Sequence, residues 1–408
     1  MNIAIVSPEF PPVTNWGGVA TFNYQLAKLL SSQSHRVFVF TLGKDLSKTK
    51  IVKTEGMTII YISYKTNKFF LKYFYKLISI VFSKHFPRLF QIISWNIFSS
   101  IEFRKWDKTS NFKVIHAPSY QSPTVLIGIS QKQKIFLHVH GPQVFLNKYE
   151  RVNLDIKLVT YLENLSMRFL CLKTISCSKF MKDKLIKRFP KFRTKTITIA
   201  NFLDDEKFDY HLPDVNKLVY WGRLERRKGV DILLKAFTKL AEKNSKLQLY
   251  LVGSPNGTFR HKGVDISFDL MLEAIVQPRF RNRIHRISYI YNRKELFSVL
   301  NKIKGIAISP SFYEPFGMVT IEAMSLGYLA VASRNGGGSE IIDPFKNGFL
   351  VKPQVFSIIQ TIKKIQALSD ESKKEIVKKA RLDFREKYSF SVASDRYKSL
   401  YKETLNLI

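Results

Sequence analysis

The distribution of apolar and polar residues along the chain predicts short buried strands that alternate with helices. In the first half, short apolar runs rich in β-branched residues are separated by helical or loop patterns, at residues 2–7, 36–41, 57–62, 112–116 and 134–139. Such continuous apolar runs are typical of strands that are buried on both faces. Their alternation with helices indicates a parallel sheet with helices on both sides.

A second set of the same kind begins near residue 218. Its predicted strands are 218–221, 247–252, 283–287, 305–308 and 329–333, and its predicted helices are 229–243, 293–301 and 318–327. The polar segment 204–217 separates the two sets, so we expect the hinge between two domains there. From residue 354 onward the pattern is helical, in roughly three segments. The sequence therefore predicts an α/β protein with two doubly wound domains, whose ligands bind at the carboxyl ends of the strands.

Length and cysteine usage agree with this organisation. A chain of 408 residues is longer than one hydrophobic core usually serves. We expect a first domain over 1–208, a second over 209–385, and a C-terminal helix over 386–408 that packs back on the first domain. Cys171 and Cys177 have no disulfide or zinc spacing and favour a reducing compartment. The first residues are typical of a strand and not of a signal peptide, so we expect a cytoplasmic protein.

The chain is strongly basic, with 66 Lys and Arg against 32 Asp and Glu and a formal net charge of +34. Such a surplus is either solvated or matched by nucleic acid, an anionic membrane or phosphorylated substrates. A general drift of composition explains the overall charge equally well, although not its local clusters. Because no recognised nucleic-acid motif is present, we expect no nucleic-acid partner. A nucleic-acid-binding protein stays the alternative from another functional class.

The segment 64–108 interleaves aromatic residues with Lys and Arg. Its longest uncharged run, residues 89–101, is too short to cross a bilayer, which needs about 20 apolar residues. One interpretation places the segment in the interface of an anionic membrane, with Trp95 and Trp106 at headgroup depth. The other is a pair of ordinary core-packing helices with lysines on their outer faces. The sequence leaves both interpretations open.

The stretch Ser309–Met324, SPSFYEPFGMVTIEAM, predicts a strand, a tight loop and the start of a helix. Such a junction presents free backbone N–H groups that favour an anion, and Gly317 lets the backbone approach it closely. Glu314 and Glu322 flank these amides. Because carboxylates repel a phosphate, we expect them to bind hydroxyl groups of a sugar or a ribose. The alternative is a solvated helix start with Glu322 on its exposed face.

Two further patterns predict phosphate contacts. Gly17 and Gly18 precede a predicted helix over 22–30, where a glycine pair lets backbone amides approach a phosphate, although turn formation alone explains the pair equally well. Arg223 and Lys228, in VYWGRLERRKGVD, follow the first strand of the second domain. A guanidinium fork and an ammonium group suit two phosphates. We expect the neighbouring Arg226 and Arg227 to be solvated.

Taken together, these residues resemble the retaining GT-B glycosyltransferases of family 4. The resemblance covers about residues 3–350 and includes Gly17 and Gly18, His140 in HVHG, Arg223 with Lys228, EPFG with Glu322, and Gly336–Gly338 before Glu340. It implies the GT-B fold, in which two Rossmann-like domains face each other across a cleft. It also implies a nucleotide diphosphate sugar as donor, with a UDP-sugar favoured over a GDP-sugar.

The resemblance also implies roles for individual residues. Arg223 and Lys228 would hold the donor diphosphate and stabilise the charge that develops as it leaves, and Glu322 would bind the ribose. Glu314 would grip the donor sugar, and His140 would lie near the reacting carbon. The donor site would also contain Gly17, Gly18, Phe316, Gly317, Met318 and Val319, with Ser178 and Asn201 as further cleft residues.

The implied reaction needs neither a metal nor a cofactor. The resemblance implies transfer with retention by front-face attack, in which the leaving phosphate takes the acceptor proton. We expect the acceptor to be a saccharide or a lipid-linked saccharide, as in polysaccharide or glycolipid synthesis at the cell surface. With a lipid-linked acceptor, the segment 64–108 would hold the enzyme on the anionic inner face of the plasma membrane. A two-carboxylate glycoside hydrolase has no use for the phosphate-binding pair. A UDP-sugar epimerase of the same fold is the enzymatic alternative.

Overall fold

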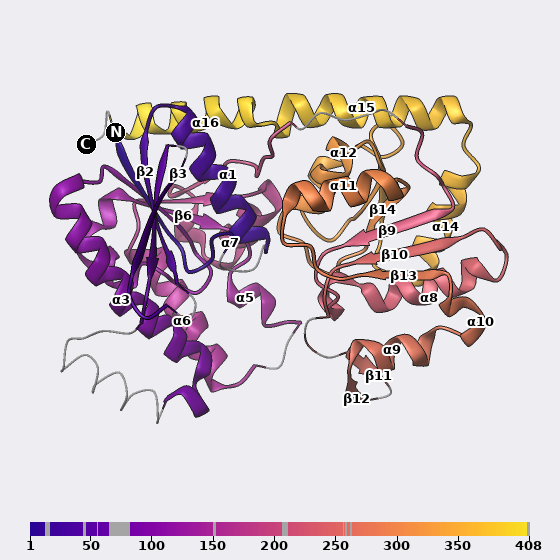
Figure 1. Ribbon diagram of the computed structural model, residues 1–408, viewed down its shortest axis with the longest axis horizontal. Coiled ribbons are helices and arrows are strands. Elements are labelled where there is room, and N and C mark those ends of the chain that lie inside the picture. Colours follow the sequence, from indigo (N-terminus) through magenta and orange to yellow (C-terminus); the bar gives the residue numbers. More distant parts are fainter. Residues whose placement is uncertain are drawn as a thin grey trace. The chain divides into compact units, whose positions relative to one another are not determined.

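The computed structural model describes residues 1–12, 17–43, 46–54, 56–64, 82–149, 152–205, 211–255, 257, 259–261 and 263–405. The chain forms two compact units, one of residues 1–200 with 394–408 and the other of residues 201–393 (Figure 1). The predicted boundaries at 208 and 385 differ from these divisions by a few residues. The described residues of the segment 204–217, where the hinge is expected, belong to the second unit.

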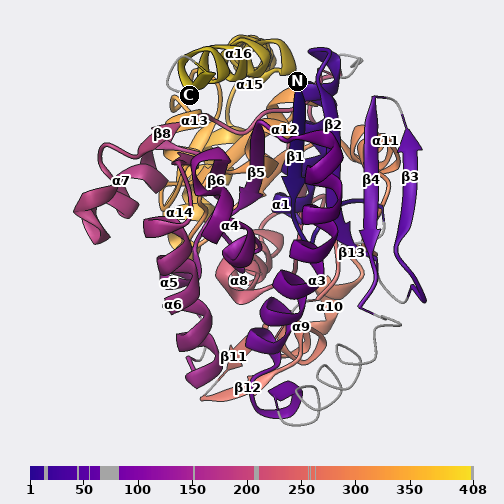
Figure 2. The ribbon, with the colours of Figure 1, turned by 90° about the vertical axis from the view of Figure 1, so that its left-hand side faces the viewer.

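The first unit contains a sheet whose described strands are β1 (Asn2–Val6), β2 (Arg36–Leu42), β3 (Lys50–Thr54), β4 (Met57–Ile62), β5 (Val114–Pro118), β6 (Ile135–Val139), β7 (Lys173–Ser176) and β8 (Thr196–Thr198). In the sheet, the strands are arranged in the order β3, β4, β2, β1, β5, β6, β7 and β8. Figure 2 shows most of these strands side by side. All neighbours pair in parallel except β3 and β4. The predicted parallel α/β sheet is therefore confirmed, with every predicted strand present.

The helices of the first unit are α1 (Gly18–Ser32), α3 (Pro87–Ser110), α4 (Val125–Gln131), α5 (Gln143–Leu146), α6 (Leu154–Phe169) and α7 (Lys179–Arg188), with 3-10 turns η1 (Lys132–Lys134) and η2 (Pro190–Phe192). The last helix, α16 (Phe390–Leu405), begins in the second unit and ends in the first. Its Tyr401 hydroxyl hydrogen-bonds to His116 Nε2 of β5 at 2.6 Å. In addition, Gln33 Nε2 donates to the Ser394 carbonyl oxygen at 2.9 Å. These two bonds fix the end of the chain to the first unit.

Helix α3 decides between the two interpretations of the basic aromatic segment for its described part. Trp95 is buried, and its Nε1 donates to the Pro123 carbonyl oxygen at 3.0 Å. Trp106 packs against Phe38, with 5.6 Å between ring centroids. Trp95 therefore cannot lie at headgroup depth, and the core-packing interpretation holds for α3. Residues 65–81 of the segment lie outside the described residues.

The second unit has a parallel sheet in the order β13, β10, β9, β14, β15 and β16, together with a separate hairpin of β11 and β12. The strands are β9 (Lys217–Trp221), β10 (Gln248–Val252), β11 (Phe259–His261), β12 (Val264–Ile266), β13 (Ile284–Ile287), β14 (Ile306–Ser309), β15 (Leu329–Ser333) and β16 (Phe349–Val351). The helices are α8 (Val230–Ala241), α9 (Phe268–Ile275), α10 (Pro278–Arg281), α11 (Arg293–Ile303), α12 (Met318–Ser325), α13 (Gly338–Ile341), α14 (Val355–Gln366) and α15 (Asp370–Tyr388), with η3 at Arg226–Lys228. Every strand predicted for this half is present, and the helical tail forms α14, α15 and α16.

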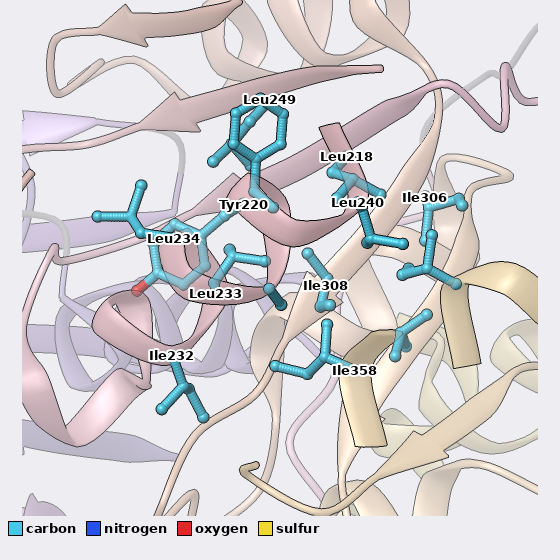
Figure 3. Close-up of a cluster of buried hydrophobic side chains, with 14 of the residues drawn as sticks. Leu218, Tyr220, Ile232, Leu233, Leu234, Leu240, Leu249, Ile306, Ile308 and Ile358 are labelled. Atoms are coloured by element: carbon cyan, nitrogen blue, oxygen red, sulfur yellow. The ribbon is translucent and has the colours of Figure 1, made fainter. Parts of the chain in front are cut away.

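The core of the second unit lies between its sheet and the helices that cover it. Leu218 of β9, Leu249 of β10, Leu233 of α8 and Ile358 of α14 are all fully buried and belong to the one cluster of apolar side chains that Figure 3 shows. Full burial of such a side chain contributes about 1.5–3 kcal/mol. This packing fixes β9 and β14, so the loops that follow their carboxyl ends have rigid supports.

No helix in the described ranges is both long enough and apolar enough to cross a membrane.

Candidate active site

The loop between β9 and α8 carries the predicted basic pair and is held in a tight conformation. Gly229, at the start of α8, has φ +74°, and a Cβ there would lie 2.3 Å from the Pro310 carbonyl oxygen. Across the same contact, the Phe312 N–H donates to the Arg227 carbonyl oxygen at 2.9 Å. The loop after β9 and the loop after β14 therefore touch, which brings the two predicted motifs together.

Lys228 and Glu314 form an ion pair at this contact, with Nζ 2.5 Å from Oε2 and each side chain 18% exposed. Burial lowers the pKa of Lys228 by more than the attraction of Glu314 and other nearby carboxylates raises it. Burial also opposes ionisation of Glu314, but the attraction of Lys228 and Arg227 outweighs it and lowers the pKa of this carboxyl. The pair therefore places a basic group that suits a phosphate beside a carboxylate that can accept hydrogen bonds from hydroxyl groups.

Arg227 is not solvated, so the expectation for this residue is wrong. Its side chain is 14% exposed, and its Nη1 donates to the Tyr313 carbonyl oxygen at 2.9 Å. Its Nη2 lies 2.5 Å from Glu225 Oε1, a carboxylate two residues earlier that the sequence prediction did not consider. Arg223 differs, since its side chain is 56% exposed and 3.5 Å from Glu225. The Arg223 guanidinium is thus accessible to a ligand.

Glu322 is buried on α12, so the alternative of a solvated helix face is excluded. Its Oε2 accepts a hydrogen bond from Trp221 Nε1 at 2.7 Å, and its Oε1 accepts one from Arg293 Nη1 at 3.2 Å. Sequence reasoning missed Arg293. Its only signal was a basic residue at the start of a predicted helix.

The glycine cluster after β15 supports the loop that carries Glu314. A Cβ on Gly336 would lie 2.1 Å from the Glu314 carbonyl oxygen, and one on Gly337 would lie 2.4 Å from that of Phe316. The Gly337 N–H also donates to the Glu314 carbonyl oxygen at 2.9 Å. Gly317, with φ +114°, precedes α12, whose first N–H groups have no intrahelical acceptors. The structure thus forms the expected anion-favouring helix start beside Glu314.

In the first unit, the glycine pair opens α1. Gly17 is the N-cap residue with φ −77°, and a Cβ on Gly18 would meet nothing within 4 Å. Neither glycine has a positive φ. Residues 13–16 lie outside the described residues.

His140 follows β6 and packs against α1, where 4.4 Å separates its ring centroid from that of Phe22. Phe22 lies one helical turn after Gly18, so His140 is close to the start of α1. Burial lowers the pKa of His140 to about 3, which keeps the imidazole neutral at pH 7. Its Nε2 is buried without a hydrogen-bond partner among the described residues. The structure thus places His140 near the glycine pair at the start of α1.

The two further cleft residues, Ser178 and Asn201, and a pair of histidines on β5 and β6 have local structural contacts. His116 Nδ1 and His138 Nε2 are 2.8 Å apart in a buried pair. Ser178 caps α7, and its Oγ accepts a hydrogen bond from the Met181 N–H at 3.0 Å. Asn201 belongs to the second unit, where its Nδ2 lies 3.5 Å from Met318 Sδ at the start of α12. Of these four residues, only Asn201 lies beside the first turn of α12.

Two family models together match most of the chain. Glycosyltransferase Family 4 matches residues 16–207, and Glycosyl transferases group 1 matches residues 204–383. The chain belongs to the GT-B glycosyltransferases of family 4 type. An uncharacterized glycosyltransferase of Methanocaldococcus jannaschii is 26% identical over 100% of both chains. The lipopolysaccharide 1,2-N-acetylglucosaminetransferase of Salmonella typhimurium is 28% identical over 46% of this chain and 49% of its own.

Solved structures show the same fold as this glycosyltransferase. Sucrose-phosphate synthase from Thermosynechococcus elongatus superimposes with a TM-score of 0.74 at 20% identity, over 100% of both chains. Anabaena HepE in complex with UDP-glucose gives a TM-score of 0.68 at 15% identity, over 99% of this chain and 100% of its own. The predicted α/β fold with parallel sheets in two domains is confirmed.

Proposed function

We propose that this glycosyltransferase transfers a hexose from a UDP-sugar to a saccharide or lipid-linked saccharide, with retention and without a metal ion. The observation that carries the proposal is the contact between two loops that joins Lys228 to Glu314 and leaves the Arg223 guanidinium accessible. Two cationic groups of this kind suit a diphosphate. Anabaena HepE, a protein of similar fold, was solved with UDP-glucose, which favours a uridine nucleotide.

In this proposal, the charged residues act on the leaving group. Arg223 and Lys228 bind the diphosphate and stabilise the negative charge that develops on it, an effect often worth several kcal/mol. The acceptor hydroxyl attacks the anomeric carbon on the face from which the diphosphate departs. A phosphate oxygen takes the hydroxyl proton, so no side-chain base is required.

Two carboxylates and a neutral histidine orient the sugar and the ribose. Glu314 accepts hydrogen bonds from hydroxyl groups of the donor sugar, while Lys228 fixes the carboxylate. His140 offers a neutral imidazole whose Nε2 is still without a partner in the described part of the first unit. It suits a sugar hydroxyl, and Glu322 suits the ribose. His140→Ala is therefore expected to lower kcat more than the affinity for UDP.

Thermal stabilisation by UDP, GDP, ADP and CMP in parallel, with a short RNA as control, tests the donor class. A nucleotide at about 100 times its Kd should stabilise the fold by about 2.7 kcal/mol. Stabilisation by UDP alone supports a UDP-sugar, and stabilisation by RNA alone contradicts the proposal. Incubation with UDP-sugars then distinguishes transfer from epimerisation, because an epimerase changes the sugar while it is still attached to UDP. Activity should persist in excess EDTA.

We further propose that the acceptor is presented at an anionic membrane on the cytoplasmic side. Helix α6 has a solvent-exposed stripe of apolar and basic side chains at helical spacing: Leu154, Lys157, Tyr161, Arg168 and Phe169. The two acidic residues of this helix, Asp155 and Glu163, are both buried. A surface with apolar, aromatic and basic side chains suits the membrane interface, where each nearby Lys or Arg contributes about 1 kcal/mol.

Co-sedimentation with liposomes tests this proposal. The protein should bind vesicles that contain anionic phospholipid at low salt and should not bind neutral vesicles. Replacing Leu154 and Tyr161 by Ser should weaken binding, whereas replacing Ile51 and Val264, which are also exposed but lie elsewhere, should not. Equal binding of both double variants would exclude the α6 stripe as the membrane surface.

A further inference from the structure

Arg293 is held in the donor half of the predicted site with an unused hydrogen-bond donor. Its side chain is only 12% exposed, and its Cζ lies 4.4 Å from the centroid of the Phe297 ring beneath it. Its Nη1 donates to Glu322 Oε1, whereas its Nη2 is buried and has no hydrogen-bond partner within the ranges that the structure describes. Buried polar groups are normally hydrogen-bonded, so an unpaired guanidinium nitrogen beside a predicted binding residue indicates a missing acceptor.

Glu322 keeps room for two further hydrogen bonds. Each of its oxygens accepts one N–H of the protein, from Trp221 on Oε2 and from Arg293 on Oε1. An ionised carboxylate has about four lone-pair sites, so each oxygen can accept one more donor. Two vicinal hydroxyl groups supply two such O–H donors. Their oxygens also need donors, and the free Nη2 of Arg293 is one.

We propose that Arg293 is a second ribose-binding residue, which orients Glu322 and donates from Nη2 to a ribose hydroxyl oxygen. This inference rests on the proposed nucleotide-sugar donor. A guanidinium beside a carboxylate matches both the donor and the acceptor capacity of a hydroxyl group. A deoxyribose would leave these buried groups unpaired, which is the arrangement that gives strong discrimination between substrates. Arg293 would then contribute to the selection of ribonucleotides over deoxyribonucleotides.

Calorimetric titration of the full chain with UDP, 2′-deoxy-UDP and 3′-deoxy-UDP tests the role of Arg293. The wild type should bind UDP about tenfold more tightly than at least one deoxy analogue, as expected for a charge-assisted hydrogen bond. Arg293→Met should lose about tenfold in UDP affinity and should bind that analogue almost as the wild type does. Arg293→Lys retains the charge but not the fork, so its preference for UDP should be intermediate.

A matched double variant controls for folding. Arg293→Met leaves the buried Glu322 carboxylate without its cation, whereas Arg293→Met with Glu322→Gln removes both charges together. The double variant should unfold thermally close to the wild type and should no longer distinguish UDP from the deoxy analogues.

Two outcomes overturn the inference, and they are distinguishable. If Arg293→Met weakens UDP and both deoxy analogues by the same factor, the residue only neutralises Glu322, and the inference fails while the proposed function stands. If the wild type binds no nucleoside diphosphate at all, the proposed function fails and the inference fails with it.

Discussion

Replacing Lys228 by Met should lower both the free energy of unfolding and kcat. The substitution removes the cation of an ion pair whose Nζ and Oε2 atoms are 2.5 Å apart, with both side chains 18% exposed. Removing one partner of a fully buried pair costs about 3–5 kcal/mol, because the remaining charge stays unpaired. Arg227 continues to attract Glu314, and both side chains are partly exposed. We therefore expect a loss of about 2–3 kcal/mol in the free energy of unfolding.

Arg223→Met is the matched control. Arg223 is 56% exposed and 3.5 Å from Glu225, and exposed pairs of this kind contribute about 0–1 kcal/mol. Both variants should lower kcat, because both residues are proposed to bind the diphosphate. Only Lys228→Met should also lower stability. Adding Glu314→Gln to Lys228→Met removes the carboxylate charge that the first substitution leaves unpaired. The double-mutant cycle for Lys228 and Glu314 should therefore give a coupling energy of about 2 kcal/mol.

Urea unfolding followed by circular dichroism measures these differences, and hydrogen exchange of peptides from residues 201–393 assigns them to the second unit. The pKa of Glu314 is lowered, so the stability contributed by its ionisation is present at neutral pH and is lost as the pH falls through the folded pKa. The gap between Lys228→Met and the wild type should therefore narrow in acid. Equal stability of Lys228→Met and Arg223→Met, or a coupling near zero, would refute this account of the pair.

Three further predictions concern individual residues. Gly336→Ala should cost about 1–3 kcal/mol and raise the donor KM, because its methyl group would meet the Glu314 carbonyl oxygen; wild-type melting and kinetics would contradict this. Gly18→Ala meets no neighbour, so it should leave thermal stability intact while raising the donor KM. Burial lowers the pKa of His116 to about 3, so this residue should contribute a fall in stability of about 1 kcal/mol per pH unit below pH 6.5, in addition to the contributions of His138 and His140, whose pKa values burial also lowers. His116→Phe should make the total fall shallower by that amount in melting curves recorded from pH 6.5 to 4.

The strands were predictable where burial makes the sequence uniformly apolar, and not elsewhere. Strand β3, KIVKT, was missed because its residues are mostly exposed and polar at an edge. Strand β8 has three residues, too few to give a pattern. Helix α3 was ambiguous for another reason, since aromatic and aliphatic residues serve a protein core and a membrane interface equally well. The contact of Trp95 with Pro123 depends on tertiary structure alone.

In the site, individual residues were predictable from local motifs, but their pairing was not. Lys228 and Glu314 are 86 positions apart, and no periodicity in the sequence joins them. Arg227 was misjudged because a surplus of basic residues makes solvation the natural expectation, whereas Glu225 and a loop carbonyl bind its guanidinium. Arg293 gave no distinct signal, since it is one of 66 Lys and Arg residues.

The chain passes from one unit to the other twice, between residues 200 and 201 and between residues 393 and 394. The first unit is consequently not a continuous piece of the gene. A truncation at residue 393 would delete Tyr397 and Tyr401, both buried, and so damage the unit at the opposite end of the sequence. A chimera that takes residues 1–200 from a relative must take that relative's last helix as well. Otherwise the sheet of the relative would pack against a helix whose side chains come from a different protein. Acceptor specificity, if it resides in the first unit, is therefore inherited in two separate segments.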